Sequence, residues 1–75
     1  MLCVVNNRKD ERIEIHFDHQ GLQFLKEQLQ RLEDLNDKEH LHLMTGAWGG
    51  NELSDEFGNE AHIELVNHLI LYSWK

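Results

Sequence analysis

The chain has 75 residues and a formal net charge of −7, with 14 acidic side chains against seven Lys and Arg. A chain of this length forms one domain, over residues 1–75. An acidic chain without a basic cluster is excluded as a direct nucleic-acid binder, because Lys and Arg supply the affinity for phosphate. The single cysteine, Cys3, rules out an intrachain disulfide. No apolar run approaches the roughly 20 residues of a membrane helix, so we expect a soluble cytoplasmic protein.

The first predicted element is a β-hairpin. Residues 2–5 form an apolar, mostly β-branched run, and the polar residues 6–11 suit a turn. Residues 12–17 then alternate strictly between polar and apolar side chains, which is the period of a half-buried strand. We expect the apolar set, Ile13, Ile15 and Phe17, to face inward and the polar set, Arg12, Glu14 and His16, to face outward.

The period changes at Asp18 to the spacing of a helix. Leucines recur at intervals of three and four residues, at Leu22, Leu25, Leu29 and Leu32, so they form one apolar stripe. The helix is predicted to begin near Asp18 or His19 and to end at Asn36-Asp37-Lys38.

Alternation returns at Glu39, where Leu41 and Leu43 are expected to face inward. Residues 45–60 contain four glycines and little periodicity, which indicates a long connection of the kind that is usually functional. A last strand is predicted from about residue 61 to residue 74, with a bend near Asn67.

The predicted order is therefore β-β-α-β-β, an α+β fold in which one helix packs on one face of a small antiparallel sheet. The other face then has no internal cover. Such a face is solvated, packs against a second copy of the chain, or binds another partner. The residues predicted to point to it are Arg12, Glu14, His16, His40, His42, Met44, His62, Glu64, Val66, His68, Ile70, Tyr72 and Trp74.

The second half of the chain is predicted to meet a basic partner. Residues 39–74 carry six acidic side chains and no Lys or Arg. Trp48, which lies among glycines, is either a side chain folded back into the core or a binding anchor. The predicted partner-binding residues are Trp48, Glu52, Asp55, Glu56, Tyr72 and Trp74.

The histidines allow a second interpretation, a zinc site. His40 and His42 would share one face of a strand, and His62 or Glu64 of a neighbouring strand could add a third ligand. The alternative is that these histidines are polar residues of an exposed face. We predict no catalytic residues, because Ser54 lies in the glycine-rich connection without the surroundings of an activated nucleophile.

One segment resembles a known family. The run His40-Leu-His-Leu-Met-Thr-Gly-Ala-Trp-Gly-Gly-Asn-Glu-Leu-Ser54, followed by a closing strand over residues 62–72, is similar to immunity protein family 32 of bacterial polymorphic toxin systems. Gly46 stands where a proline is expected after Thr45. The positions that match the motif are His40, His42, Trp48, Gly49, Gly50, Glu52 and Leu53.

The resemblance implies a single-domain α+β protein without enzymatic activity that binds and neutralises a cognate toxin in the producing cell. Combined with the acidic second half, it predicts a basic toxin as the partner. A histidine-based metal-binding domain and a homodimer formed through the open sheet face remain alternatives at this point.

Overall fold

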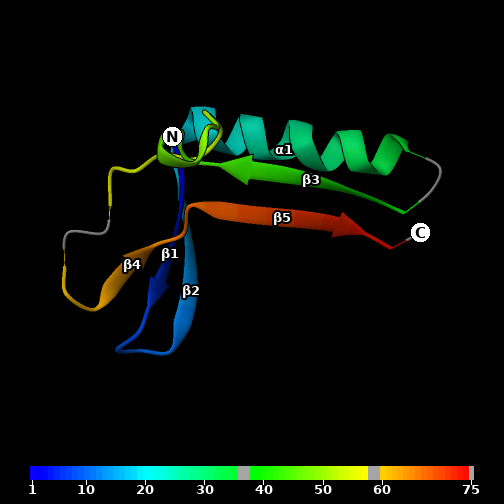
Figure 1. The fold of residues 1–75 in the computed structure, drawn as a ribbon. Coiled ribbons are helices and arrows are strands. Elements are labelled where there is room, and N and C mark those ends of the chain that lie inside the picture. Colours follow the sequence, from blue (N-terminus) through cyan, green and yellow to red (C-terminus); the bar gives the residue numbers. More distant parts are fainter. Residues whose placement is uncertain (36–37, 58–59, 75) are drawn as a thin grey trace.

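A computed structural model describes residues 1–35, 38–57 and 60–74 (Figure 1). The predicted order of strands and helix is confirmed, except that the last strand is divided in two. The elements are β1 (Leu2–Asn7), β2 (Arg12–Phe17), α1 (His19–Asp34), β3 (Glu39–Met44), the 3₁₀ helix η1 (Gly46–Trp48), β4 (Ile63–Leu65) and β5 (His68–Ser73).

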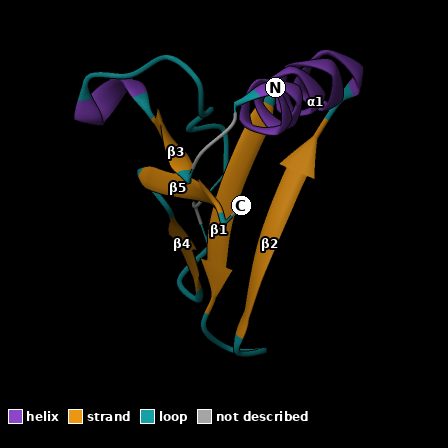
Figure 2. Ribbon diagram, turned by 90° about the vertical axis from the view of Figure 1, so that its right-hand side faces the viewer, coloured by secondary structure: helices purple, strands orange, loops and turns teal. Residues whose placement is uncertain are grey.

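The strands form two small antiparallel sheets where the sequence predicted one. The first has the order β2-β1-β4, and the second pairs β3 with β5. In the first sheet Leu2 lies opposite Phe17, and Val5 lies opposite Leu65. In the second, Met44 lies opposite His68. The α+β class is confirmed, because one helix packs beside antiparallel strands (Figure 2).

The predicted bend near Asn67 is the point where the chain passes from one sheet to the other. The Val66 N–H donates to the Val4 carbonyl at 2.9 Å, and the Thr45 N–H donates to the Asn67 carbonyl at 3.0 Å. The Thr45 hydroxyl also donates to the Asn67 side-chain oxygen at 2.6 Å. Val66 was expected to point outward, and that expectation is wrong: the change of sheet turns its side chain onto the core.

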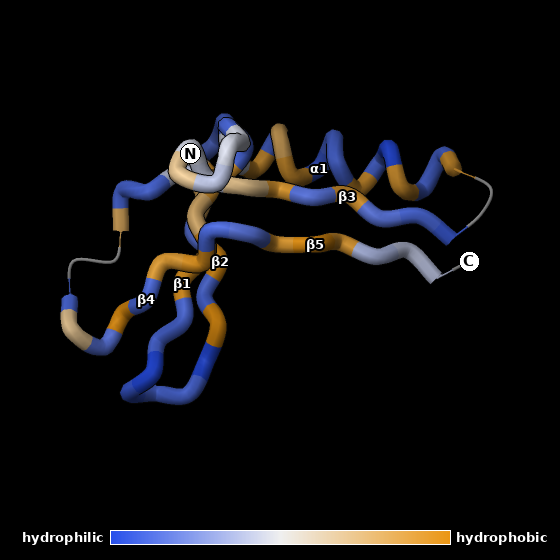
Figure 3. The backbone as a smooth tube through the Cα atoms, in the orientation of Figure 1, coloured by the Kyte–Doolittle hydropathy of each residue, from blue (hydrophilic) through white to orange (hydrophobic). Residues whose placement is uncertain are grey.

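The core lies where both sheets meet α1. The buried members are Leu2, Val4, Leu43 and Leu53, against which Phe24, Leu25, Val66, Leu69 and Leu71 pack. Figure 3 shows apolar residues on β3, β5 and α1, whereas the turn between β1 and β2 at the opposite end is hydrophilic. The inward positions predicted for Leu41 and Leu43 agree with the register of β3, since Leu43 is 1% exposed.

The helix begins where the sequence predicted. Asp18 is its N-cap, and its carboxylate accepts a hydrogen bond from the Gly21 N–H at 2.8 Å. The same carboxylate pairs with the amino group of Met1. This hydrogen bond from the amino group, followed by that from Gly21, lowers the pKa of Asp18. The helix ends at Asp34, and two of the residues predicted to end it, Asn36 and Asp37, lie outside the described part of the chain.

Two predicted burial patterns are wrong. Ile13, Ile15 and Phe17 do share one face of β2, but they are 60%, 48% and 46% exposed. On α1, Leu29 is 51% exposed although it lies in the leucine stripe. β2 is the outer strand of its sheet, so its apolar face lies beyond the buried residues Leu2 and Val4 of β1.

The connection after β3 is more regular than predicted. Thr45 caps η1, and an isolated bridge joins Thr45 to Leu53. Gly49 closes the turn with φ +88°, a conformation that favours glycine. Gly50 lies so close to β3 that a Cβ there would be 2.6 Å from the Met44 carbonyl oxygen. This glycine pair therefore sets the position of Trp48.

No helix in the described ranges is both long enough and apolar enough to cross a membrane.

Candidate functional site: a ring surface on the second sheet

A row of aromatic and imidazole rings covers the open face of the β3–β5 sheet. We call it the ring surface. Because β3 and β5 are antiparallel, side chains of paired residues stand on the same face, so His40 joins Tyr72 and Met44 joins His68. The members of the ring surface, from η1 to the end of β5, are Trp48, His68, His42, His40, Tyr72 and Trp74.

Each ring of this surface lies beside the next. The centroid separations are 6.0 Å for Trp48–His68, 5.0 Å for His68–His42, 4.9 Å for His42–His40, 5.1 Å for His40–Tyr72 and 6.1 Å for Tyr72–Trp74. These are the separations at which aromatic pairs interact favourably. The rings therefore support one another and form a continuous surface along the whole sheet.

The ring surface is open to solvent. Trp48 is 59% exposed, Tyr72 58% and Trp74 76%. At its far end a shallow hollow of about 140 Å³ lies between Tyr72 and Trp74, next to Lys38. The Lys38 ammonium lies 5.1 Å from the centre of the Trp74 ring, so this end of the surface already attracts a cation.

The structure does not bring the four predicted zinc ligands together. His42 Nδ1 and His68 Nε2 share a hydrogen bond at 2.7 Å, so these two atoms are engaged with each other. His62 faces Glu60, with 3.4 Å between His62 Nε2 and the carboxylate, and Glu64 lies on β4 of the other sheet. In the described part of the chain no group of three or more His, Cys, Asp or Glu side chains is placed to hold a metal ion.

One of the predicted acidic contacts, Glu56, lies away from the ring surface. Glu56 lines a hollow of about 410 Å³ on the first sheet, together with Glu14, His16 and Phe57. The ring of Phe57 stacks on His16 at 4.9 Å. The structure thus separates Glu56 from the aromatic members of the predicted partner-binding set.

Glu52 lies in the loop that follows η1. Its carboxylate accepts a hydrogen bond from the Asn51 N–H at 2.6 Å, and its own N–H donates to the Met44 carbonyl. This residue therefore helps to shape the loop beyond η1, next to the Trp48 end of the ring surface. Asp55 is exposed farther along that loop.

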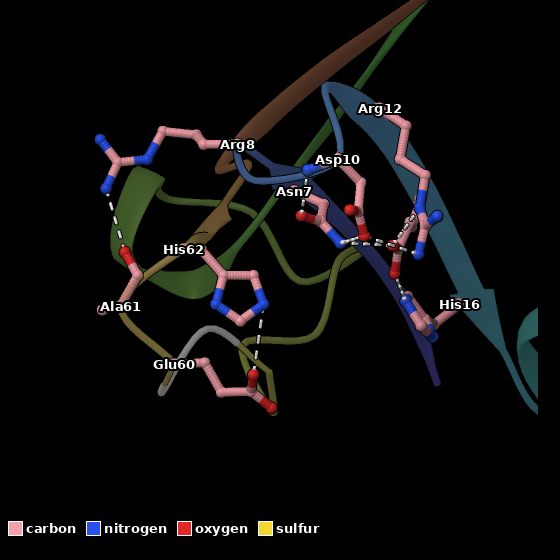
Figure 4. Close-up of polar contacts among 9 residues, drawn as sticks. Asn7, Arg8, Asp10, Arg12, His16, Glu60, Ala61 and His62 are labelled. Atoms are coloured by element: carbon pink, nitrogen blue, oxygen red, sulfur yellow. Dashed lines mark hydrogen bonds and ion pairs between the residues drawn. The ribbon is translucent and has the colours of Figure 1, made fainter.

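The hairpin of β1 and β2 carries a polar cluster centred on Glu14. Its carboxylate accepts hydrogen bonds from Asn7 Nδ2 at 3.0 Å, Arg12 Nε at 2.7 Å and His16 Nε2 at 2.9 Å. Figure 4 shows these side chains converging. The bonds, that from Asn7 first, lower the pKa of Glu14 to about 2. This carboxylate is therefore held charged, which suits a structural role.

Cys3 offers no nucleophile. Its side chain is fully buried, and burial raises the pKa of its thiol. The thiolate is the reactive form of cysteine, so these surroundings disfavour reaction.

The comparison with known families identifies the chain. One family model, described as Immunity protein 32, matches residues 12–70. The chain belongs to this family. The match begins at β2 and includes α1, η1 and the first half of β5, so every residue of the ring surface except Tyr72 and Trp74 lies within it. No curated protein and no solved structure matches the chain.

Sequence analysis of this Immunity protein 32 family member missed one residue of the surface. His68 was placed on the outward face but was not included in the predicted site. In the structure it joins Trp48 to His42 and so makes the surface continuous. The register of the two strands could have revealed His68. Pairing residues 39–44 with 68–73 places His68 opposite Met44, beside the start of the glycine-rich loop.

Proposed function

We propose that this chain is a cytoplasmic immunity protein that neutralises a cognate protein toxin by binding it through the ring surface, without catalysis of its own. Membership of the Immunity protein 32 family supports the general role. The observation that carries the proposal is the unbroken row of rings from Trp48 to Trp74, in which Trp48, Tyr72 and Trp74 are each more than half exposed.

The composition of the ring surface supports binding to a protein. Tyr and Trp are enriched at the residues that contribute most to protein–protein affinity, because a rigid ring buries a large area at a small entropic cost. Three large rings that are each more than half exposed form an apolar patch. Exposing such a patch to water is unfavourable in free energy, and a partner that covers it removes this cost.

The charge of the chain supports a basic toxin. A net charge of −7 attracts a basic protein over long range and speeds its encounter with the chain. At short range, Lys and Arg of such a toxin can stack on the exposed rings, as Lys38 already does on Trp74. The acidic residues Asp55 and Glu56 would then steer the approach while the rings hold the complex.

The experiment begins with the toxin itself. The chain is used to recover partners from its native lysate, and the toxin is taken to be a recovered protein whose expression alone arrests growth and whose toxicity is relieved by co-expression of this chain. Its affinity is then measured by calorimetry against purified variants. Trp48→Ala and Tyr72→Ala are each expected to weaken the complex by about 2 kcal/mol or more, because each removes a large exposed ring.

The matched control is Phe57→Ala. Phe57 is also an aromatic residue on the surface, 39% exposed, but it lies on the first sheet beside His16. We expect it to leave affinity and growth rescue nearly unchanged. Equal affinity for Trp48→Ala, Tyr72→Ala and the unchanged chain would contradict the ring surface as the contact, and the absence of any protein whose toxicity the chain relieves would contradict the immunity function.

A further inference from the structure

The outer edge of β2 is open. In the first sheet β2 is bonded to β1 on one side, and in the described part of the chain no strand pairs with its other side (Figure 2). Unpaired N–H and C=O groups along an edge strand are a template for another strand. Natural edges are commonly blocked by proline or lysine, but the chain contains no proline and residues 12–17 contain no lysine.

One face of this edge strand is apolar and exposed to solvent. Ile13, Ile15 and Phe17 are 60%, 48% and 46% exposed, and they stand next to one another on the face that carries Leu2 and Val4 farther in. The opposite face of β2 carries Arg12, Glu14 and His16. A partner strand should therefore be apolar on one face and charge-complementary on the other.

A second copy of β2 meets both of these requirements. In an antiparallel pair, residues directly opposite one another stand on the same face. If Ile15 lies opposite Ile15 of a second copy, Ile13 lies opposite Phe17 of that copy. On the other face, Glu14 then lies opposite His16, and Arg12 opposite Asp18. Every position across the pair thus meets an apolar or an oppositely charged neighbour, with His16 counted as the cation when protonated.

The neighbouring registers are worse for a physical reason. Centring the pair on Glu14 places the two Glu14 carboxylates directly opposite one another. Centring it on His16 places Glu14 opposite Asp18. Both arrangements bring like charges together, which destabilises a strand pair, so charge favours Ile15 over either neighbouring centre.

We propose that two copies of this chain form a symmetric dimer in which β2 pairs with β2 about a two-fold axis at Ile15. The two three-stranded sheets then join into one six-stranded sheet, in the order β4-β1-β2-β2-β1-β4. The pairing uses the same edge of both copies, so it closes at two and does not continue into a fibre. The ring surface lies on the other sheet and stays free for a toxin.

The first test is sedimentation of the purified chain over a concentration series. We expect a dimer that dissociates on dilution. Ile15→Glu places two carboxylates at the axis and is expected to abolish the dimer, whereas Tyr72→Glu, on the ring surface, is expected to leave it intact. A chain that is monomeric at every concentration overturns the proposal, as does loss of the dimer in Tyr72→Glu alone, which would place the interface on the open face of β3 and β5.

The second test checks the register by cross-linking. Across an antiparallel pair, opposite Cα atoms lie about 4.5–5.5 Å apart, within reach of a disulfide. Ile15→Cys is therefore expected to form a covalent dimer on mild oxidation. In the same register the two copies of residue 13 lie about 13 Å apart, so Ile13→Cys is the matched control and is expected to stay monomeric on a denaturing gel.

The natural Cys3 does not disturb this comparison, because its side chain is fully buried. Ile13 and Ile15 are both exposed positions of one strand, so collisions between molecules would cross-link both variants alike. Equal cross-linking of Ile13→Cys and Ile15→Cys overturns the register. Both tests use the chain without a toxin, so their outcome is independent of the proposed immunity function.

Discussion

At the scale of single residues, the loop that carries Trp48 depends on a glycine at position 50. The Gly50 N–H donates to the Thr45 carbonyl at 3.0 Å, which draws the loop back onto β3. No side chain fits there, because a Cβ would lie 2.6 Å from the Met44 carbonyl oxygen and 2.7 Å from the Met44 Cβ. The Met44 carbonyl accepts hydrogen bonds from the N–H groups of Glu52 and Leu53, each at 3.2 Å, and Met44 itself is paired with His68 of β5.

The close approach of Gly50 to Met44 predicts that a larger residue at position 50 lowers the stability of the fold. Gly50→Ala is expected to destabilise the fold by about 1–3 kcal/mol, because backbone must move to admit the methyl group. Gly46→Ala, in the same loop, adds a methyl group with no atom within 4 Å and is expected to change stability by less than about 0.5 kcal/mol. Urea unfolding of both variants measures the difference, and equal midpoints would show that the loop relaxes freely.

Residue identity alone predicted the helix start well. Asp18 was expected near the N-terminus of the helix, and it is the N-cap. That success has a local cause, because capping involves only residues within one turn. Exposure of Trp48 could not be predicted in this way, since it depends on where η1 lies relative to β5.

At the scale of elements, the β1–β2 hairpin is tied by a charged cluster at its end. Glu14 accepts hydrogen bonds from Asn7, Arg12 and His16, so one carboxylate joins both strands. Strict alternation in residues 12–17 predicted β2 correctly, but it did not show that the apolar face would lack cover. The position of a strand within a sheet is set by the rest of the fold.

The lowered pKa of Glu14 predicts an acid-sensitive contribution to stability. Its pKa in the folded chain is about 2, below the ordinary value of 4.5. The contribution is therefore complete above about pH 4.5 and is lost as the pH falls toward 2. Glu14→Gln is expected to lower the thermal midpoint at pH 7, and the difference from the unchanged chain should shrink between pH 4.5 and pH 2.

Thermal melts followed by circular dichroism across this pH range measure the effect. The control is Glu27→Gln, which removes an exposed carboxylate of α1. It is expected to keep the midpoint of the unchanged chain at pH 7. A Glu14→Gln midpoint that stays offset by the same amount at pH 7 and pH 2 would contradict the role assigned to this carboxylate.

At the scale of the whole molecule, the two sheets give an elongated shape. The radius of gyration is 13.2 Å, larger than the value of about 11 Å expected for a compact domain of this length. The extents are 42 × 24 × 23 Å. In Figure 1 the hairpin and β4 point away from the layer of α1, β3 and β5, so the ring surface and the β2 edge lie on separate parts of the molecule.

The negative charge of the whole chain predicts how the proposed complex with a basic toxin forms. Raising the salt concentration should slow association with a basic toxin steeply, because the Debye length falls to about 10 Å at 0.1 M salt. Glu56→Gln is expected to lower the association rate and its salt dependence, whereas Trp48→Ala should mainly raise the dissociation rate. Stopped-flow mixing at several salt concentrations separates the two effects, and an association rate independent of salt would remove the steering role.

The sequence by itself determined the α+β class, the order of the elements, the helix N-terminus and the outward positions of Tyr72 and Trp74. Each of these follows from neighbours in the chain, through periodicity, capping or alternation. Only the tertiary structure decided the split into two sheets, because the bonds of Thr45 to Asn67 and of Val66 to Val4 join residues far apart in the sequence. It also decided which apolar side chains stay exposed and that the acidic residues near Glu56 lie apart from the rings, since burial depends on what the fold places over each position.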